Sequence, residues 1–130
     1  MTRHAYDCHV RFSDVDVYGH VNNVKYLEFY QEARLAFLDA VGALTRADSF
    51  GLVVARIDVD YRRPILFRPE PYVIESWVSR LGTSSFTLEA EISDGESVLS
   101  RACTVLVSFD LGTQRSRRLT TLERESLQPG

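Results

Sequence analysis

Hydrophobic and polar residues alternate near the start of the chain, over residues 5–13. Tyr6, Cys8, Val10 and Phe12 occupy one set of alternate positions, and Asp7, His9, Arg11 and Ser13 occupy the other. A period of two over this length predicts a half-buried β-strand. Residues 14–23 break the alternation and contain a glycine and two asparagines, which are typical of turns and helix caps.

The hydrophobic spacing becomes helical over residues 23–41. The apolar residues that recur at intervals of three and four are Tyr26, Tyr30, Ala33, Phe37, Ala40 and Val41. Leucines beside this stripe widen it, which predicts a helix largely enclosed by the rest of the fold. Gly42 is expected to end the helix.

A period of two returns after a polar link at residues 45–51. Strands are predicted over residues 53–61, 72–81, 86–92 and about 97–109, with an Asp94-Gly95 hairpin between the last two. The tail from Gly112 is polar and is expected to fray or to end in a short helical turn. One strand, one long helix and four meandering strands predict an α+β fold.

A single domain over residues 1–130 is expected, with its core at about 5–110 and the tail at about 112–130. One sheet and one helix leave a sheet edge or face uncovered, which predicts a homo-oligomer. The chain is 45% hydrophobic and 25% charged, which excludes a wholly disordered protein.

Charge and composition narrow the function further. A net charge of −3 argues against a general nucleic-acid binder. No apolar run approaches the roughly 18 residues of a membrane span, and the N-terminus lacks the apolar region of a signal peptide, so a cytoplasmic location is expected. Cys8 and Cys103 are expected to be reduced thiols. The three histidines, His4, His9 and His20, are too dispersed to predict a metal site.

One segment carries a family resemblance. Asp14-Val15-Asp16-Val17-Tyr18-Gly19-His20-Val21-Asn22-Asn23, followed by Tyr26 and by Glu32-Ala33-Arg34, resembles the hotdog-fold thioesterases, and most of all the 4-hydroxybenzoyl-CoA thioesterase-like group. The likeness covers about residues 5–110. It implies a hotdog fold, in which a five-stranded antiparallel sheet wraps around one long central helix. It also implies hydrolysis of an acyl-CoA at sites between the subunits of a homodimer or homotetramer. Coenzyme A then enters as part of the substrate, and no other cofactor and no metal is implied.

Two groups of the motif take catalytic roles by this resemblance. Asp16 corresponds to the catalytic carboxylate, and the backbone N–H of Asn23 corresponds to the amide that polarises the thioester carbonyl. An ionised carboxylate is able to activate water or to attack the carbonyl itself, and the residues do not choose between these routes. The first amides of a helix lack intrahelical partners and lie at its positive dipole end. Gly19 would let the backbone approach the substrate closely, whereas Asp14 is expected to be structural.

The motif also departs from the hydroxybenzoyl enzymes. Those enzymes have a Pro-Ala-Gly turn where this chain has Val17-Tyr18-Gly19. The following His-Val-Asn-Asn is more similar to fatty-acyl thioesterases, in which a histidine of this segment has been given a role. His20 is therefore a candidate catalytic residue beside its plainer interpretation as a hydrogen-bonding loop residue, and the acyl group stays open.

Substrate-binding candidates lie outside the motif as well. Arginine suits phosphate because its planar fork binds two oxygens at once. The candidates are Tyr26 on the helix, Arg62, Arg63 and Arg80 for the phosphates of coenzyme A, and Ser84 and Ser85 for phosphate or the pantetheine chain. Each of them also has a plain structural or surface interpretation.

Three other functions are compatible with the same pattern. The first is a hotdog protein that binds acyl-CoA without hydrolysis, and Asp16 argues against it because a binder gains nothing from an anion beside an electrophilic carbonyl. The second is an enoyl-CoA hydratase or dehydratase, which His20 keeps open. The third is a structural dimerisation domain, which leaves the acidic turn motif unexplained.

Overall fold

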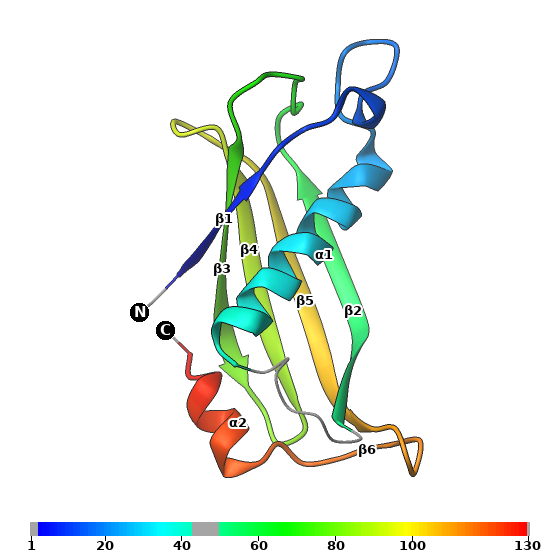
Figure 1. Ribbon diagram of the computed structural model, residues 1–130, viewed down its shortest axis with the longest axis vertical. Helices are drawn as coiled ribbons and strands as arrows, with labels where there is room; N and C mark the ends of the chain where they lie inside the picture. Colours follow the sequence, from blue (N-terminus) through cyan, green and yellow to red (C-terminus); the bar gives the residue numbers. More distant parts are fainter. Residues whose placement is uncertain (1–2, 43–49, 130) are drawn as a thin grey trace.

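The computed structural model describes residues 3–42 and 50–129, and its centre is an antiparallel sheet with a long helix across one face (Figure 1). In chain order the elements are β1 (His4–Cys8), the 3₁₀ helix η1 (Phe12–Asp14), α1 (Asn23–Ala40), β2 (Phe50–Tyr61), β3 (Tyr72–Leu81), β4 (Ser85–Ser93), β5 (Val98–Asp110), β6 (Arg115–Ser116) and α2 (Thr121–Ser126). The strand order is β1-β3-β4-β5-β2, with β6 beside β5. The predicted α+β fold is confirmed. The predicted count of five strands is wrong, because two residues of the tail add the sixth strand, β6.

The first strand is shorter than the alternation predicted. It ends at Cys8, although the period of two continues to Ser13. The reason is local, since the Asp14 carboxylate accepts a hydrogen bond from the Arg11 amide at 2.8 Å and draws the chain into η1. A side chain that bonds nearby backbone competes in this way with continued strand pairing.

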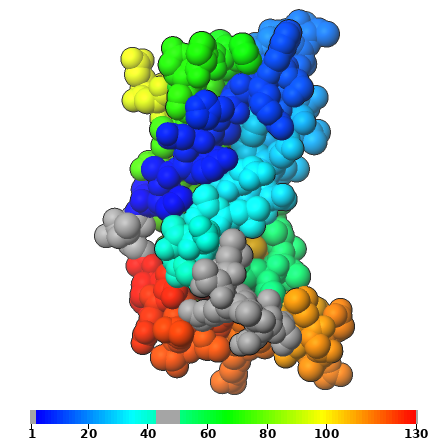
Figure 2. All heavy atoms as spheres, in the orientation of Figure 1, coloured from blue at the N-terminus to red at the C-terminus, as the bar shows by residue number. Residues whose placement is uncertain are grey.

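Helix α1 begins and ends close to the predicted residues, and it packs on the sheet with one side only. Its buried residues are Tyr26, Phe29, Tyr30, Ala33, Phe37 and Leu38. Leu27 and Leu35 are each 42% exposed, and Figure 2 shows part of the outer side of the helix, in cyan, at the surface. Within the described ranges, the prediction of a largely enclosed helix is therefore wrong.

The C-terminal segment is held against the sheet. Leu119 and Leu127 are buried in one hydrophobic cluster with Phe86 and Leu106. Thr120 and Glu123 cap α2 reciprocally, because each side chain accepts a hydrogen bond from the other's backbone amide. The short helical turn is confirmed, and the alternative expectation of fraying is not. Of the helices in the described ranges, none has the length and apolarity needed to cross a membrane.

Candidate active site

The loop between η1 and α1 is closed on itself by backbone hydrogen bonds. Val15 and Val21 form an antiparallel bridge, and the Asn22 amide donates to the Asp14 carbonyl at 2.9 Å. At the tip, Gly19 has a φ of +78°, a conformation that other residues rarely adopt. A Cβ at Gly19 would meet nothing within 4 Å, so conformation rather than space favours glycine here.

Asp16 presents an exposed carboxylate on this loop. Its Oδ1 accepts hydrogen bonds from the backbone amides of Tyr18, at 2.9 Å, and of His20, at 3.2 Å. Among residues 3–42 and 50–129, no side chain or amide donates to Oδ2. The loop therefore orients the carboxylate through one oxygen and leaves the other for water or a ligand.

The start of α1 presents an amide that is also free. Asn22 is the N-cap, and its Oδ1 accepts a hydrogen bond from the Val24 amide at 3.0 Å. Asn23 is the first helical residue, and its own amide donates to no acceptor within the described part of the chain. This N–H lies at the positive end of the helix dipole, where it suits an oxygen that gains negative charge.

These two groups line one pocket of about 370 Å³. The lining residues are Asp16, His20, Val21, Asn23, Tyr26, Tyr61, Arg62, Arg63 and Pro64. They come from the loop, from the first turn of α1 and from the end of β2 with the residues after it, which Figure 1 shows at the same end of the molecule. The structure thus brings together six of the predicted site residues: Asp16, His20, Asn23, Tyr26, Arg62 and Arg63.

The remaining predicted residues do not line this pocket. Arg80 is exposed near the end of β3, Ser84 lies in the turn to β4, and Ser85 begins β4. Figure 1 places this turn at the opposite end of the sheet from the loop before α1. The Ser84 carbonyl also accepts a hydrogen bond from Ser108. Gly19, at the loop tip, is not a lining residue of the pocket.

Tyr61, Pro64 and Val21 are pocket residues that the sequence did not single out. The Tyr61 ring contacts the ring of Tyr26 edge to face, with centroids 4.7 Å apart. Tyr26 is buried, and burial raises the pKa of its hydroxyl. Tyr61 closes the alternating run of residues 53–61, but only the topology shows that this end of the strand adjoins the loop.

Asp14 has a different environment from Asp16, although they are two residues apart. Its side chain is fully buried and accepts hydrogen bonds from the amide and the guanidinium of Arg11. Burial by itself raises the pKa of Asp14, but the bonds from Arg11 outweigh it and hold that pKa below its usual value. These hydrogen bonds hold the backbone at the start of η1, which agrees with the expected structural role of Asp14.

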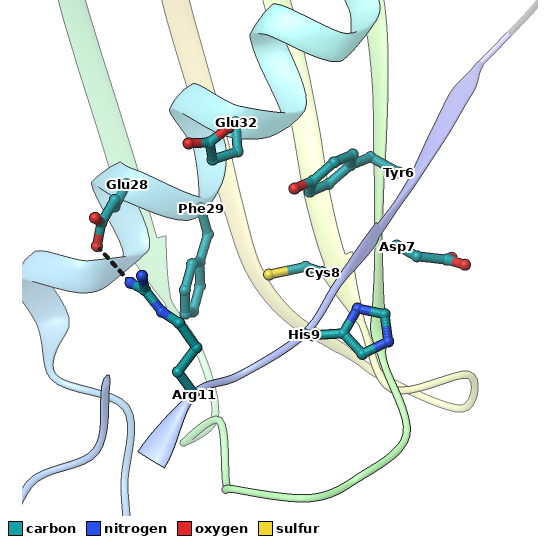
Figure 3. A pocket seen from close by; sticks show the side chains of 8 residues that line it. All are labelled: Tyr6, Asp7, Cys8, His9, Arg11, Glu28, Phe29 and Glu32. Atoms are coloured by element: carbon teal, nitrogen blue, oxygen red, sulfur yellow. Dashed lines mark hydrogen bonds and ion pairs between the residues drawn. The ribbon is translucent and has the colours of Figure 1, made fainter. Parts of the chain in front are cut away.

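A second pocket, of about 310 Å³, lies between β1 and α1 (Figure 3). Tyr6 and Cys8 extend from β1 toward the helix, whereas Asp7 and His9 extend away from it. Burial raises the pKa of the Cys8 thiol to about 12, which keeps it protonated and poorly nucleophilic. In the described ranges, no group of three or more His, Cys, Asp or Glu residues is arranged to hold a metal ion.

A match over most of the chain identifies its superfamily. Residues 10–128 match the model of the thioesterase-like superfamily. The chain belongs to this superfamily. Membership confirms the resemblance to hotdog-fold thioesterases at the level of the family, and it confirms the expectation of a thioester hydrolase.

Relatives of this thioesterase-like chain cover nearly its whole length. It is 36% identical over 125 residues to the long-chain acyl-CoA thioesterase FadM of Escherichia coli, which covers 92% of each chain. The PA2801 protein of Pseudomonas aeruginosa is 30% identical, with a TM-score of 0.85 over 96% of this chain and 98% of that one. A thioesterase of Thermus thermophilus, solved with coenzyme A and zinc, is 31% identical, with a TM-score of 0.81 over 95% and 90%.

Proposed function

We propose that the protein hydrolyses acyl-CoA thioesters to a free acid and coenzyme A, with Asp16 and the Asn23 amide as its catalytic groups. One observation carries the proposal: a carboxylate oxygen and a helix N-terminal amide, both without partners in the described ranges, line the same pocket. The likeness to FadM supports coenzyme A as the carrier and favours a long-chain acyl group.

The reaction follows from the two groups. A thioester carbonyl oxygen bound at the Asn23 N–H would be stabilised as negative charge develops on it. Asp16 would take a proton from water while the water oxygen attacks the carbonyl carbon, and the thiolate of coenzyme A would then leave and take up a proton. In the other route Asp16 attacks the carbon itself, and water hydrolyses the resulting mixed anhydride. His20 lines the same pocket and is proposed as a further participant. CoA enters as part of the substrate, and the reaction uses no other cofactor.

The carrier would bind toward the basic residues at the pocket. Arg62 and Arg63 line it directly after β2, and a guanidinium suits the phosphates of coenzyme A. The Arg63 side chain also donates to Ser97 at 3.2 Å, which orients its guanidinium. Gly19 is proposed to let the substrate pass close to the loop backbone.

Homodimers or homotetramers with active sites at the subunit interface are the proposed assembly. β2 is an edge strand of 12 residues that pairs only with β5 in the described chain, and long free edges favour pairing with a second copy. Antiparallel pairing of two β2 strands about a two-fold axis would reverse the second sheet. Arg80, Ser84 and Ser85 of the second copy would then lie at the same end as Asp16 of the first. We propose a cytoplasmic location, from the sequence arguments alone.

The test is release of coenzyme A from a panel of acyl-CoA thioesters by the wild type and Asp16→Asn. The variant is expected to lose about 10²–10⁴-fold in kcat, the usual contribution of a general base. Asp39→Asn, the same change at an exposed position on α1, serves as the control and should stay active. An equally active Asp16→Asn refutes the assignment. Acyl-CoA binding without release would instead indicate a binding protein, and enoyl-CoA conversion without release would indicate a hydratase.

A further inference from the structure

We propose that Tyr61 is a positioning residue that holds the first turn of α1 in place for the reaction; this inference rests on the proposed function. The Tyr61 hydroxyl donates a hydrogen bond to the Asn23 carbonyl at 3.1 Å. Tyr61 ends β2, and Asn23 begins α1, so this bond ties the sheet to the start of the helix. Tyr61 itself would not contact the reacting atoms.

The bond acts on the peptide unit next to the proposed oxyanion donor. The Asn23 carbonyl and the Val24 amide belong to one planar peptide group. Tyr61 donates to its oxygen, and the Asn22 side chain accepts from its N–H at 3.0 Å. Because both its oxygen and its N–H are bonded, this peptide group is held in one orientation. It therefore fixes the start of the helix and the direction of the preceding N–H, which is that of Asn23. Without such contacts the first turn of a helix tends to fray.

The tyrosine is itself well anchored. Its ring packs edge to face on Tyr26, which is 3% exposed and belongs to the core. The residues after it are bound to β5, because the Arg62 and Arg63 amides both donate to the Leu99 carbonyl at 3.0 Å. Tyr61 remains 49% exposed at the pocket. The sheet and the buried ring of Tyr26 therefore hold the Tyr61 side chain in place. Its hydroxyl is thus suited to positioning the start of α1.

The test compares Tyr61→Phe with Tyr30→Phe, each of which removes a single hydroxyl. Tyr30 is also on α1, and its hydroxyl donates to Ser100 at 2.7 Å inside the core, away from the pocket lining. Tyr61→Phe is expected to lower kcat about tenfold with KM within twofold, because a transition-state contact is misplaced but not removed. Its pH profile should keep the wild-type midpoint. Tyr30→Phe should lower the melting temperature and keep kcat within twofold.

A second readout does not depend on activity. Hydrogen exchange at the Val24 amide should be faster in Tyr61→Phe than in the wild type, and unchanged in Tyr30→Phe. Unchanged exchange overturns the inference, and so does a kcat within twofold. A tenfold rise in KM with kcat unchanged also overturns it, because Tyr61 would then be a substrate contact. A wild type without thioesterase activity refutes the proposed function, and the exchange measurement still decides whether Tyr61 holds the helix.

Discussion

Asp14 and Asp16 provide a matched pair for separating stability from catalysis. They lie in one loop, but Asp14 is fully buried whereas Asp16 is exposed. Asp14→Ala removes the acceptor of three hydrogen bonds from Arg11, one from its amide and two from its guanidinium. Asp16→Ala removes the acceptor of two backbone amides at the surface. We expect the first change to destabilise the fold and the second to spare it.

The loss of stability in Asp14→Ala depends on which hydrogen-bond donors lose their acceptor. The side chain of Arg11 is 58% exposed, so water replaces its bonds and they add little. The Arg11 amide at the start of η1 would lose the charged acceptor that it bonds, and a hydrogen bond to a charged group contributes about 1.5–3 kcal/mol. A loss of about 2 kcal/mol would lower the melting temperature by roughly 6–8 °C in a domain of this size. Asp16→Ala should cost less than about 1 kcal/mol, as surface changes do.

The stabilisation should depend on pH in a stated direction. The folded-state pKa of Asp14 is lowered, so its carboxylate stabilises the fold above its unfolded pKa of about 3.9. This contribution is lost as the pH falls through the lowered folded pKa. The difference in melting temperature between the wild type and Asp14→Ala should therefore have its maximum value at pH 7 and decrease below about pH 4.

Thermal denaturation followed by circular dichroism at pH 3 to 7 measures both variants, and coenzyme A release measures their activity. Asp14→Ala at a temperature where it is folded should retain most of its activity. If Asp14→Ala melts with the wild type at pH 7, or if Asp16→Ala loses more stability than Asp14→Ala, the structural role of Asp14 is wrong.

Two further predictions concern the C-terminal helix and the buried thiol. Leu127→Ala should lower the free energy of unfolding by about 2–4 kcal/mol in urea denaturation, because Leu127, the C-cap of α2, is 3% exposed. Leu122→Ala, at a position on α2 that is 60% exposed, should change it by less than about 0.5 kcal/mol. Equal stability of these two variants would mean that the C-terminal segment does not pack as described. Cys8 should resist iodoacetamide at pH 8 in the folded protein and react after unfolding, since burial raises its pKa to about 12. A mass-spectrometric adduct on Cys8 of the folded protein would contradict this burial.

Local patterns predicted most of the helices and strands, because the spacing of hydrophobic residues depends on which side of each element faces the core. The strand over residues 72–81 agrees with β3, and the helix over residues 23–41 differs from α1 by one residue. Where a side chain bonded backbone nearby, the pattern misled, as at the end of β1. The polar tail concealed two buried leucines, because a short capped helix needs few apolar residues to dock.

From the sequence, the family resemblance alone implied that Asp16 and Asn23 act together, and their place in one short segment limits how far apart they can lie. Only the tertiary structure decided that Tyr61, Arg62 and Arg63 complete the same pocket. Their position depends on β2 pairing with β5 and running toward the start of α1. That pairing depends on contacts between segments that are far apart in the sequence, and the pattern of neighbouring residues does not predict such contacts.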